Sequence, residues 1–436
     1  MNVEQNESRR SFLRKSGMGA AVVAVGPIAK SASSANDVIG VGCIGLGVRG
    51  GTLNRLVVRN EGVKVVALCD VYQPHVEKGV RQSNNPDVKT YIDYQDLLAD
   101  KNVDAVVIAV PDHWHSRMLI DAANAGKDVY IEKGWTRTID EAKAMREAVK
   151  KNNIIMQLGH QSRGQAAGVQ AAELIRDGVI GPVTMVRTGR MENRPVGTNF
   201  WRWYGWYDNY ERPDPKQVVK ELDWERWLGP VGKRPFNEEH FWHWRCYWDF
   251  GTGIAGDLLS HEIDFVHSVL QHGIPDSCVT MGINAFNNDG RDVPDTWTSI
   301  FNFEEAKRQV TFECSMNTRE RTVTPTFHGK HGVLEFDQIA QSVSDFAVYP
   351  DRGTQKYQKA FEEGKLKGGE PMLRFDPDKT QTPTHMEDFF NCVRSRKKTK
   401  CHEDEAFVEA ATLVMSVKAL REKREVQWDR NKEEVV

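Results

Sequence analysis

A glycine-rich turn followed by an acidic residue gives the clearest indication of chemistry in the sequence. Gly45, Gly47 and Gly50 form the pattern G-x-G-x-x-G, and Asp70 follows 20 residues after the last glycine. Glycines in this pattern allow a tight turn and a close approach of the backbone to a pyrophosphate, which lies at a helix N-terminus. A carboxylate at this spacing binds the ribose hydroxyls and repels a 2′-phosphate. We therefore predict a dinucleotide site for NAD rather than NADP.

Asp257 and His261 form a second candidate pair. On a helix from about 256 to 270 they are residues i and i+4 and lie on one face. A histidine with the ordinary pKa of about 6.5 suits a general base at neutral pH. Asp264 and Ser268 continue the same polar stripe. The spacing alone therefore favours an ordinary solvated face over an active site.

Residues 193–250 are rich in aromatic side chains and hold eight of the 12 tryptophans. Trp203 and Tyr204 lie in this stretch, whose Pro, Asn, Asp and Gly content predicts a long loop or short helical turns. Aromatic faces beside polar groups suit a sugar ring. A long loop also uses aromatic residues to pack itself or to bury a subunit interface. Both interpretations stay open.

No metal site is predicted. His113 and His115 form an H-x-H pair on a predicted loop, but no third ligand accompanies them. The seven cysteines are scattered along the chain and show neither a disulfide nor a zinc-binding pattern. Cys43 and Cys69 lie within apolar strands and are predicted to be core residues.

The elements that must position these residues change character along the chain. Apolar strands alternate with helical segments up to about residue 157, and Thr138 and Glu141 form a capping box before a helix that ends near Asn152. This pattern predicts a Rossmann-type, doubly wound parallel sheet. The six strands are expected at 38–44, 63–69, 89–91, 103–110, 128–132 and 154–158.

The second half has longer strands without helices between them, which predicts an α+β domain with a large, mostly antiparallel open sheet. The strands are expected at 182–191, 278–286, 297–303, 308–314 and 322–327. Helices near 166–177 and 256–270 are expected to cover one face. Two more, near 384–395 and 403–422, close the chain, and whether they pack back on the first domain stays open.

The first 35 residues have the layout of a bacterial signal peptide. Arg9 and Arg10 precede a modestly apolar stretch, and small residues lead to Ala35. Paired arginines indicate the Tat route, so the protein is expected in the periplasm or another extracytoplasmic space. The predicted division is residues 1–35 signal peptide, 36–157 NAD-binding domain and 158–436 substrate-binding and catalytic domain.

Composition excludes some classes of function. The chain has 436 residues with 58 Lys+Arg against 61 Asp+Glu. It therefore has no excess of positive charge that would indicate nucleic-acid binding. No apolar run is long enough for a membrane span. We expect no nucleic-acid partner and no membrane insertion after the signal is removed.

Several motifs in the same order resemble the Gfo/Idh/MocA family of NAD(P)-dependent sugar oxidoreductases, over about residues 38–430. They are the glycine turn, Val-Pro-Asp-His-Trp-His at 110–115, Ala-Gly-Lys-Asp-Val at 125–129, Glu132-Lys133, Trp244-Arg245 and Gly-Asp-Leu-Leu-Ser-His at 256–261. One departure is Gly134, which stands where the family has proline after the lysine.

The resemblance implies a division of roles. Lys133 lies beside the nicotinamide and polarises the carbonyl oxygen, His261 takes the hydroxyl proton, and Asp257 binds a substrate hydroxyl or orients the imidazole. The implied cofactor site is Gly45, Leu46, Gly47, Val48, Arg49, Asp70, Pro111, Trp114, His115, Glu132, Lys133 and Gln161. The implied substrate site is Arg163, Arg245, Asp257 and His261, to which the aromatic segment adds Trp203 and Tyr204 as candidates. Whether Arg245 binds sugar hydroxyls or forms a structural salt bridge stays open.

The leading hypothesis is an exported NAD-dependent dehydrogenase that acts on a secondary hydroxyl, C3 preferred, of a sugar or glycoside. Because free NAD is scarce outside the cytoplasm, the cofactor is expected to stay tightly bound, in a homo-oligomer such as a dimer or tetramer. One alternative is a glycosidase that uses NAD transiently, by oxidation and elimination with no net redox change. Another is a non-catalytic sugar-binding protein in which NAD is structural.

Overall fold

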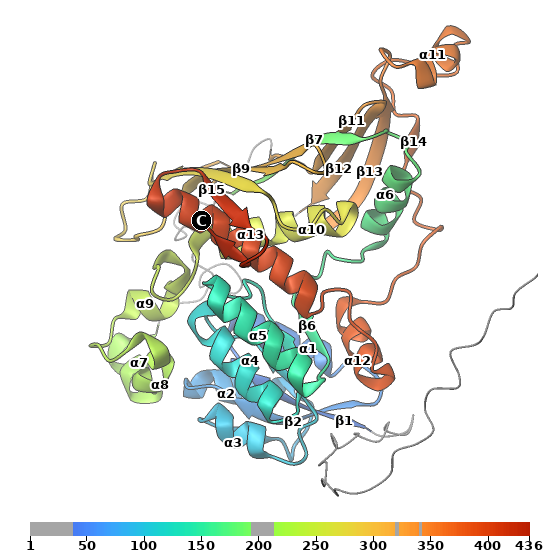
Figure 1. The fold of residues 1–436 in the computed structure, drawn as a ribbon. Coiled ribbons are helices and arrows are strands. Elements are labelled where there is room, and N and C mark those ends of the chain that lie inside the picture. Colours follow the sequence, from blue (N-terminus) through green and yellow to red (C-terminus); the bar gives the residue numbers. More distant parts are fainter. Residues whose placement is uncertain (1–37, 193–212, 319–321, 340–341) are drawn as a thin grey trace, which may run out of the picture.

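The computed structural model describes residues 38–192, 213–318, 322–339 and 342–436. They form two sheets with helices between them (Figure 1). Arg9, Arg10, Trp203 and Tyr204, for which predictions were made from the sequence, lie outside the described residues.

The first sheet is fully parallel, with strand order β3-β2-β1-β4-β5-β6. The order reverses between β1 and β4, which is where ligands bind at the carboxyl ends of such strands. The predicted Rossmann-type sheet is confirmed. Its strands are β1 (Ile39–Ile44), β2 (Val63–Cys69), β3 (Lys89–Tyr91), β4 (Ala105–Ile108), β5 (Asp128–Ile131) and β6 (Met156–Leu158). Its helices are α1 (Val48–Val57), α2 (Gln73–Gln82), α3 (Tyr94–Ala99), α4 (His115–Asn124) and α5 (Ile139–Asn152).

Burial explains why these strands could be read from the sequence. Every residue of β1, β4, β5 and β6 is buried, as expected for parallel strands covered on both faces. At the start of α5, the Glu141 N–H donates to Thr138 Oγ1, but the Glu141 carboxylate accepts from Thr136 and Arg137 instead of the Thr138 N–H. The predicted capping box is therefore half formed.

The second sheet has ten strands in the order β14-β13-β12-β11-β7-β10-β9-β8-β15-β16. Its pairs are antiparallel except for β7 with β10, which confirms the predicted mostly antiparallel sheet. The strands are β7 (Val183–Met191), β8 (Ser277–Ile283), β9 (Thr296–Phe303), β10 (Arg308–Ser315), β11 (Thr326–Gly329), β12 (Gly332–Ile339), β13 (Ser342–Pro350), β14 (Leu373–Arg374), β15 (Val426–Asp429) and β16 (Glu434–Val435). The helix α11 (Gln355–Glu362) projects from one end of the sheet (Figure 1).

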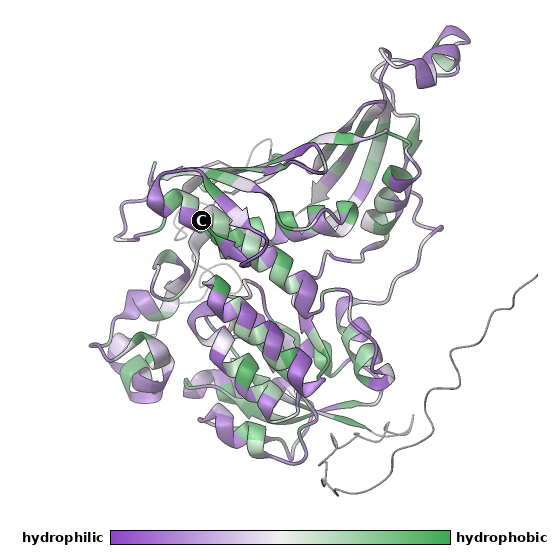
Figure 2. Cartoon of the chain, in the orientation of Figure 1, coloured by the Kyte–Doolittle hydropathy of each residue, from purple (hydrophilic) through white to green (hydrophobic). Residues whose placement is uncertain are grey.

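Helices cover the face of this sheet that points toward the nucleotide-binding domain (Figure 1). They are α6 (Ala166–Arg176), α10 (Ser260–Leu270) and α13 (Glu403–Glu422). In Figure 2 the helices that cover both sheets mix hydrophobic and hydrophilic residues, as expected where one side of a helix packs and the other meets solvent.

Both C-terminal helices lie against the first domain. Phe389 of α12 (His385–Ser395) packs edge-on against Tyr130 of β5, with ring centroids 5.9 Å apart. On α13, the ring of Phe407 lies 3.7 Å under the guanidinium of Arg146 from α5. These two C-terminal helices therefore connect the second domain to the first.

Residues 213–250 form a separate lobe beside the nucleotide-binding domain, built from α7 (Pro215–Glu221), α8 (Trp224–Leu228) and α9 (Glu238–Trp242) (Figure 1). The lobe has an apolar core around Val218, Trp227 and Phe250, which also includes Tyr72 from the nucleotide-binding domain. The predicted short helical turns are therefore present in the described part of the aromatic segment.

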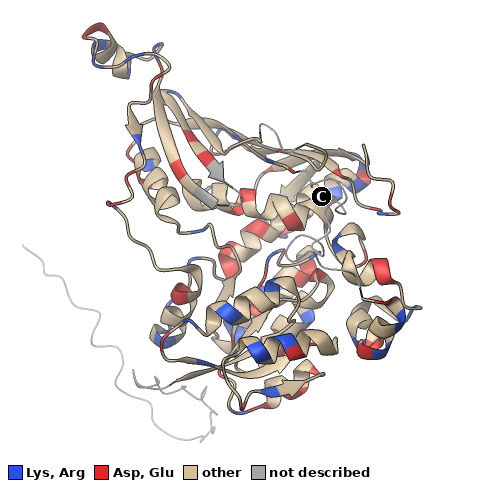
Figure 3. Cartoon of the chain, turned by 180° about the vertical axis from the view of Figure 1, so that it is seen from behind, with Lys and Arg blue, Asp and Glu red and all other residues tan. Residues whose placement is uncertain are grey.

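Charges of both signs are interspersed over the described part of both domains (Figure 3). Among the described residues, no helix is both long and apolar enough to cross a membrane.

Candidate active site

The glycine turn connects β1 to α1 and has the geometry that its sequence predicts. Gly45 has a φ of +82°, and a Cβ there would lie 2.4 Å from the Ala109 carbonyl oxygen. A Cβ on Gly50 would lie 1.8 Å from the carbonyl oxygen of Gly45, so this glycine allows the helix to pack on the turn. The nearest atom to a Cβ on Gly47 is 3.6 Å away, on His75, so this glycine faces space at the cavity.

The N-terminus of α1 fits a pyrophosphate. The first turn of the helix has no acidic residue, and no side chain caps it, so its backbone N–H groups point toward an anion site. Arg49 lies in this turn and lines the cavity, where it adds positive charge. Its Nε donates to Glu132 Oε1 at 2.7 Å and its terminal nitrogen to Gln161 Oε1 at 3.1 Å.

Asp70 ends β2 and is fixed by its neighbours. Its carboxylate accepts from the Leu46 N–H at 2.6 Å and the Tyr72 N–H at 2.9 Å, and it lies 3.3 Å from His75 Nδ1. The side chain lines the cavity at the position where a ribose diol lies in such folds. Leu46 itself is buried and contributes through its backbone rather than through the cavity wall.

A cavity of about 710 Å³ joins this cofactor end to the second domain. It brings together most of the residues predicted for the site. Those that line it are Gly45, Gly47, Val48, Arg49, Asp70, Pro111, Trp114, Glu132, Lys133, Gln161, Arg245, Asp257 and His261.

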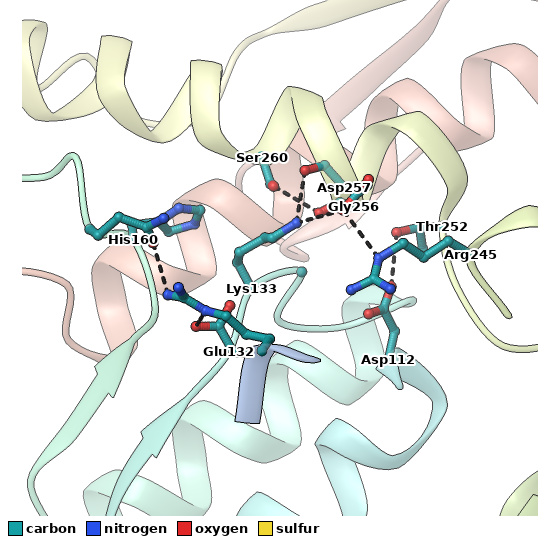
Figure 4. Close-up of polar contacts among 12 residues, drawn as sticks. Asp112, Glu132, Lys133, His160, Arg245, Thr252, Gly256, Asp257 and Ser260 are labelled. Atoms are coloured by element: carbon teal, nitrogen blue, oxygen red, sulfur yellow. Dashed lines mark hydrogen bonds and ion pairs between the residues drawn. The ribbon is translucent and has the colours of Figure 1, made fainter. Parts of the chain in front are cut away.

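Lys133 and Asp257 form the centre of the far end (Figure 4). Lys133 Nζ donates to Asp257 Oδ1 and to the Asp257 carbonyl oxygen, each at 2.8 Å. Arg245 Nε donates to the same Oδ1 at 3.2 Å, and the Arg245 guanidinium lies 4.0 Å above the Trp244 ring. One carboxylate therefore holds two cationic donors at the cavity. Of the two roles left open for Arg245, the ion pair is present, and the side chain also lines the cavity.

Asp257 does not lie on the regular α-helix that its spacing predicts. The segment Ala255–Leu259 is a π-helical turn, and α10 begins only at Ser260. The wider turn changes the i, i+4 relation of Asp257 to His261, although both still line the cavity. Such turns occur often at functional sites.

His261 is partly exposed to the cavity, and its surroundings keep it neutral. Burial, followed by the positive charges of Lys133, His160 and Arg190, lowers the pKa of His261 well below the usual value of 6.5. The imidazole is therefore unprotonated at neutral pH and able to accept a proton. The expectation of an unperturbed pKa is wrong.

His160 was not predicted from the sequence, yet its ring lies edge-on to His261 with centroids 5.6 Å apart. Its Nε2 lies 3.2 Å from Glu409 Oε1, and its Nδ1 lies 4.0 Å from Asp264 Oδ2. Burial opposes the charged form, but these two carboxylates raise the pKa of His160. The only signal in the sequence is its place two residues after the end of β6, next to Gln161.

Arg163 is not a cavity residue, which corrects its prediction as a substrate ligand. Its guanidinium is buried and pairs with Asp264 at 2.9 Å and Glu405 at 2.8 Å, and it donates to the Lys400 carbonyl oxygen at 3.0 Å. These partners come from elements far along the chain. Arg163 therefore holds the second domain together behind the site.

His115 also lies behind the cavity, which corrects its prediction as a direct cofactor ligand. It is fully buried, with Nδ1 2.8 Å from the Gly134 carbonyl oxygen and Nε2 2.9 Å from that of Val110. His113 Nε2 lies 3.0 Å from the Trp227 carbonyl oxygen. Backbone carbonyls therefore lie at both ring nitrogens of His115 and at Nε2 of His113.

The described aromatic residues of 213–250 pack the lobe, as one of the two interpretations expected, and contact with a sugar ring stays a prediction. Trp227 and Trp242 are buried in the core of the lobe, and both also line the cavity. Ile92, Asp93 and Arg226 line the cavity near Asp70 and were not predicted, because nothing in their spacing marks them.

Comparisons with known proteins agree with this geometry. A model described as "Oxidoreductase family, NAD-binding Rossmann fold" matches residues 38–160, and one described as "Oxidoreductase family, C-terminal alpha/beta domain" matches residues 170–364. The chain is 28% identical over 205 residues to a glycosyl hydrolase family 109 protein of Shewanella baltica (strain OS185), covering 40% of this chain and 44% of that protein. It is 31% identical over 191 residues to an inositol 2-dehydrogenase of Salmonella paratyphi B (strain ATCC BAA-1250 / SPB7), covering 43% and 53%.

The match thus spans about half the length of these curated relatives. Among solved structures, a levoglucosan dehydrogenase in complex with NADH and levoglucosan has a TM-score of 0.64 at 19% identity, covering 90% of this chain and 99% of that one. This likeness shows that the fold is shared.

Proposed function

Because the chain belongs to the Gfo/Idh/MocA family of oxidoreductases and has an NAD-binding Rossmann domain, we propose that it is an exported dehydrogenase of sugars or glycosides. It oxidises a secondary hydroxyl and keeps its NAD tightly bound. The observation that carries this proposal is the single cavity that joins the glycine turn to Lys133, Asp257 and His261. A sugar-type substrate is supported by the names of the relatives.

The reaction breaks one C–H and one O–H bond of the substrate and leaves a ketone. Bound NAD would supply the hydride acceptor. His261, which is neutral, accepts the hydroxyl proton at a ring nitrogen. Lys133 Nζ donates to the hydroxyl oxygen and stabilises the negative charge that develops there. Asp257 fixes the positions of Lys133 and Arg245, so the substrate oxygens meet two donors at a set spacing.

The lowered pKa of His261 also favours the reverse step, because the protonated imidazole readily returns its proton to a ketone. This property suits a cofactor that is reoxidised in place by a second ketone or another acceptor, as scarcity of free NAD outside the cytoplasm requires. C3 of a glycoside is the preferred position, because a 3-ketone acidifies the C2 proton and prepares the glycosidic bond for elimination.

A second candidate is an NAD-requiring glycosidase, which the relative named glycosyl hydrolase family 109 protein favours. Oxidation, elimination, water addition and reduction would then follow one another with no net redox change. The same residues would serve the oxidation and the final reduction.

Incubation of the purified protein with a panel of glycosides, with mass spectrometry of the products and absorbance at 340 nm, separates these functions. A ketone product with NADH formation supports the dehydrogenase. Release of the aglycone without a ketone supports the glycosidase and contradicts the leading proposal. Sugar binding without either product would mean that the protein is a binding module.

A further inference from the structure

The lobe 213–250 is joined to the nucleotide-binding domain at the carboxyl end of β2. The Asp223 N–H donates to the Val71 carbonyl oxygen at 2.9 Å, and Tyr72 and Leu222 form an isolated antiparallel bridge. The Tyr72 ring is fully buried and packs edge-on against Phe241, with centroids 5.5 Å apart. Backbone pairing and ring packing therefore fix the lobe immediately after Asp70.

A second junction lies after β4. The Trp227 carbonyl oxygen accepts from Trp114 Nε1 at 2.8 Å and lies 3.0 Å from His113 Nε2. Gly229 has a φ of +46°, and a Cβ there would lie 2.0 Å from the Trp114 ring, so its backbone is pressed against that ring. The lobe is thus attached to both strand ends that border the cofactor end of the cavity.

Between these junctions, Arg226 of α8 reaches across to the nucleotide-binding domain. It pairs with Asp93 at 3.7 Å and with Asp223 at 2.5 Å, and it lines the cavity together with Ile92 and Asp93. A guanidinium held in this way presents a flat cationic face, which stacks well on an aromatic ring.

The position of these residues identifies what they would cover. Asp70 marks the ribose next to the adenine, so the adenine lies beyond it, near the ends of β2 and β3. We propose that the lobe is a clamp over the adenosine half of the cofactor, with Arg226 as the residue that closes it. NAD then leaves only when the contacts of Arg226 with Asp93 and of Trp227 with Trp114 are broken.

This inference rests on the proposed function, in which the cofactor stays bound between turnovers. The clamp is the structural feature that would keep NAD bound between turnovers. Arg226 and Asp93 are not among the residues that hold Lys133 and Asp257 at the reacting end of the cavity, so retention and chemistry are separable by mutation at these two positions.

The test measures NAD release rather than turnover. Native protein, Arg226→Ala and Asp93→Asn are purified with NAD bound, held in dilute buffer, and passed over a desalting column at intervals, and the retained NAD is quantified by chromatography after heat release. Lys233→Ala is the matched control, because Lys233 is an exposed residue of the same lobe, pairs with Glu225 and does not line the cavity.

We expect Arg226→Ala to release NAD about tenfold faster than native protein, Asp93→Asn to change in the same direction, and Lys233→Ala to match native protein. Unchanged melting temperatures would show that the variants are folded. If Arg226→Ala and Asp93→Asn both released NAD as slowly as native protein, the clamp would be refuted and the proposed function would stand. Native protein that loses its NAD on the first column would overturn the clamp and the tight cofactor retention of the proposed function, while the glycoside panel would still decide the dehydrogenase activity.

Discussion

Replacement of His261 by alanine is the most direct test of the proposed chemistry. The change removes the base but leaves the glycine turn and Asp70 untouched, so bound NAD should remain. Loss of a general base costs about 10²–10⁴ in rate. Because the pKa of His261 is lowered, proton transfer to it has less driving force than transfer to an ordinary histidine. We therefore expect the lower part of that range, about 10²–10³, or ~3–4 kcal/mol in activation free energy.

The assay is single-turnover reduction of bound NAD, followed at 340 nm against sugar concentration. His75→Ala is the matched control, since His75 lines the cofactor end of the cavity beside Asp70. At saturating sugar we expect His261→Ala to be slow and the control to react at the native rate once loaded with NAD. His261→Ala protein that reduces its NAD at the native rate would refute the assignment of the base.

The pH dependence of the same step gives an independent check. Neutral His261 is the reactive form, and its pKa lies well below 6.5. The native rate of the step should therefore stay flat from about pH 6.5 upward through neutrality and decline only in more acidic solution, as the imidazole becomes protonated. A decline centred at pH 6.5 or above would contradict the lowered pKa.

Three further changes test other parts of the structure. Asp70→Ala should weaken discrimination between NAD and NADP by ~1–3 kcal/mol, measured by titration of cofactor-free protein, and a native preference for NADP would overturn the assignment. Arg163→Ala should lower the free energy of unfolding by ~3–5 kcal/mol, because Asp264 keeps a buried and less compensated charge, while KM for the sugar changes little. A large rise in KM without loss of stability would restore Arg163 as a substrate ligand. Replacing Arg9 and Arg10 by lysine should leave folded, cofactor-loaded protein in the cytoplasm, and unaltered export in cell fractionation would mean that the N-terminus is not a Tat signal.

The nucleotide-binding half could be predicted closely because its strands are continuous apolar runs. Residues 39–44 and 105–108 are wholly buried, and no charged side chain interrupts them. In β12, by contrast, buried Leu334 and Phe336 alternate with exposed Glu335 and Asp337 on the open face of the sheet. The charges hide such a strand from a search for apolar runs, and β12 and β13 were not predicted.

Site residues divide according to how far away their partners lie in the chain. The glycine turn and Asp70 act within one strand–helix–strand unit, so their spacing identifies them. Arg163 follows the last strand of that sheet, but its partner Asp264 is 101 residues away. Local sequence does not show that such a carboxylate neutralises the guanidinium. The same holds for His160, whose surroundings come from α10 and α13.

Gly134 shows why a departure from the family pattern need not disturb the lysine before it. A Cβ on Gly134 would lie 3.1 Å from the Cα of Gly256, so the loop after Lys133 passes directly against the π-helical turn. His115, buried behind it, lies within hydrogen-bond distance of the Gly134 carbonyl oxygen and fixes the loop. Lys133 Nζ then reaches both the side chain and the carbonyl oxygen of Asp257. Glycine at 134 therefore does not loosen the lysine, because the close contact that it permits brings the two domains together at the reacting end of the cavity.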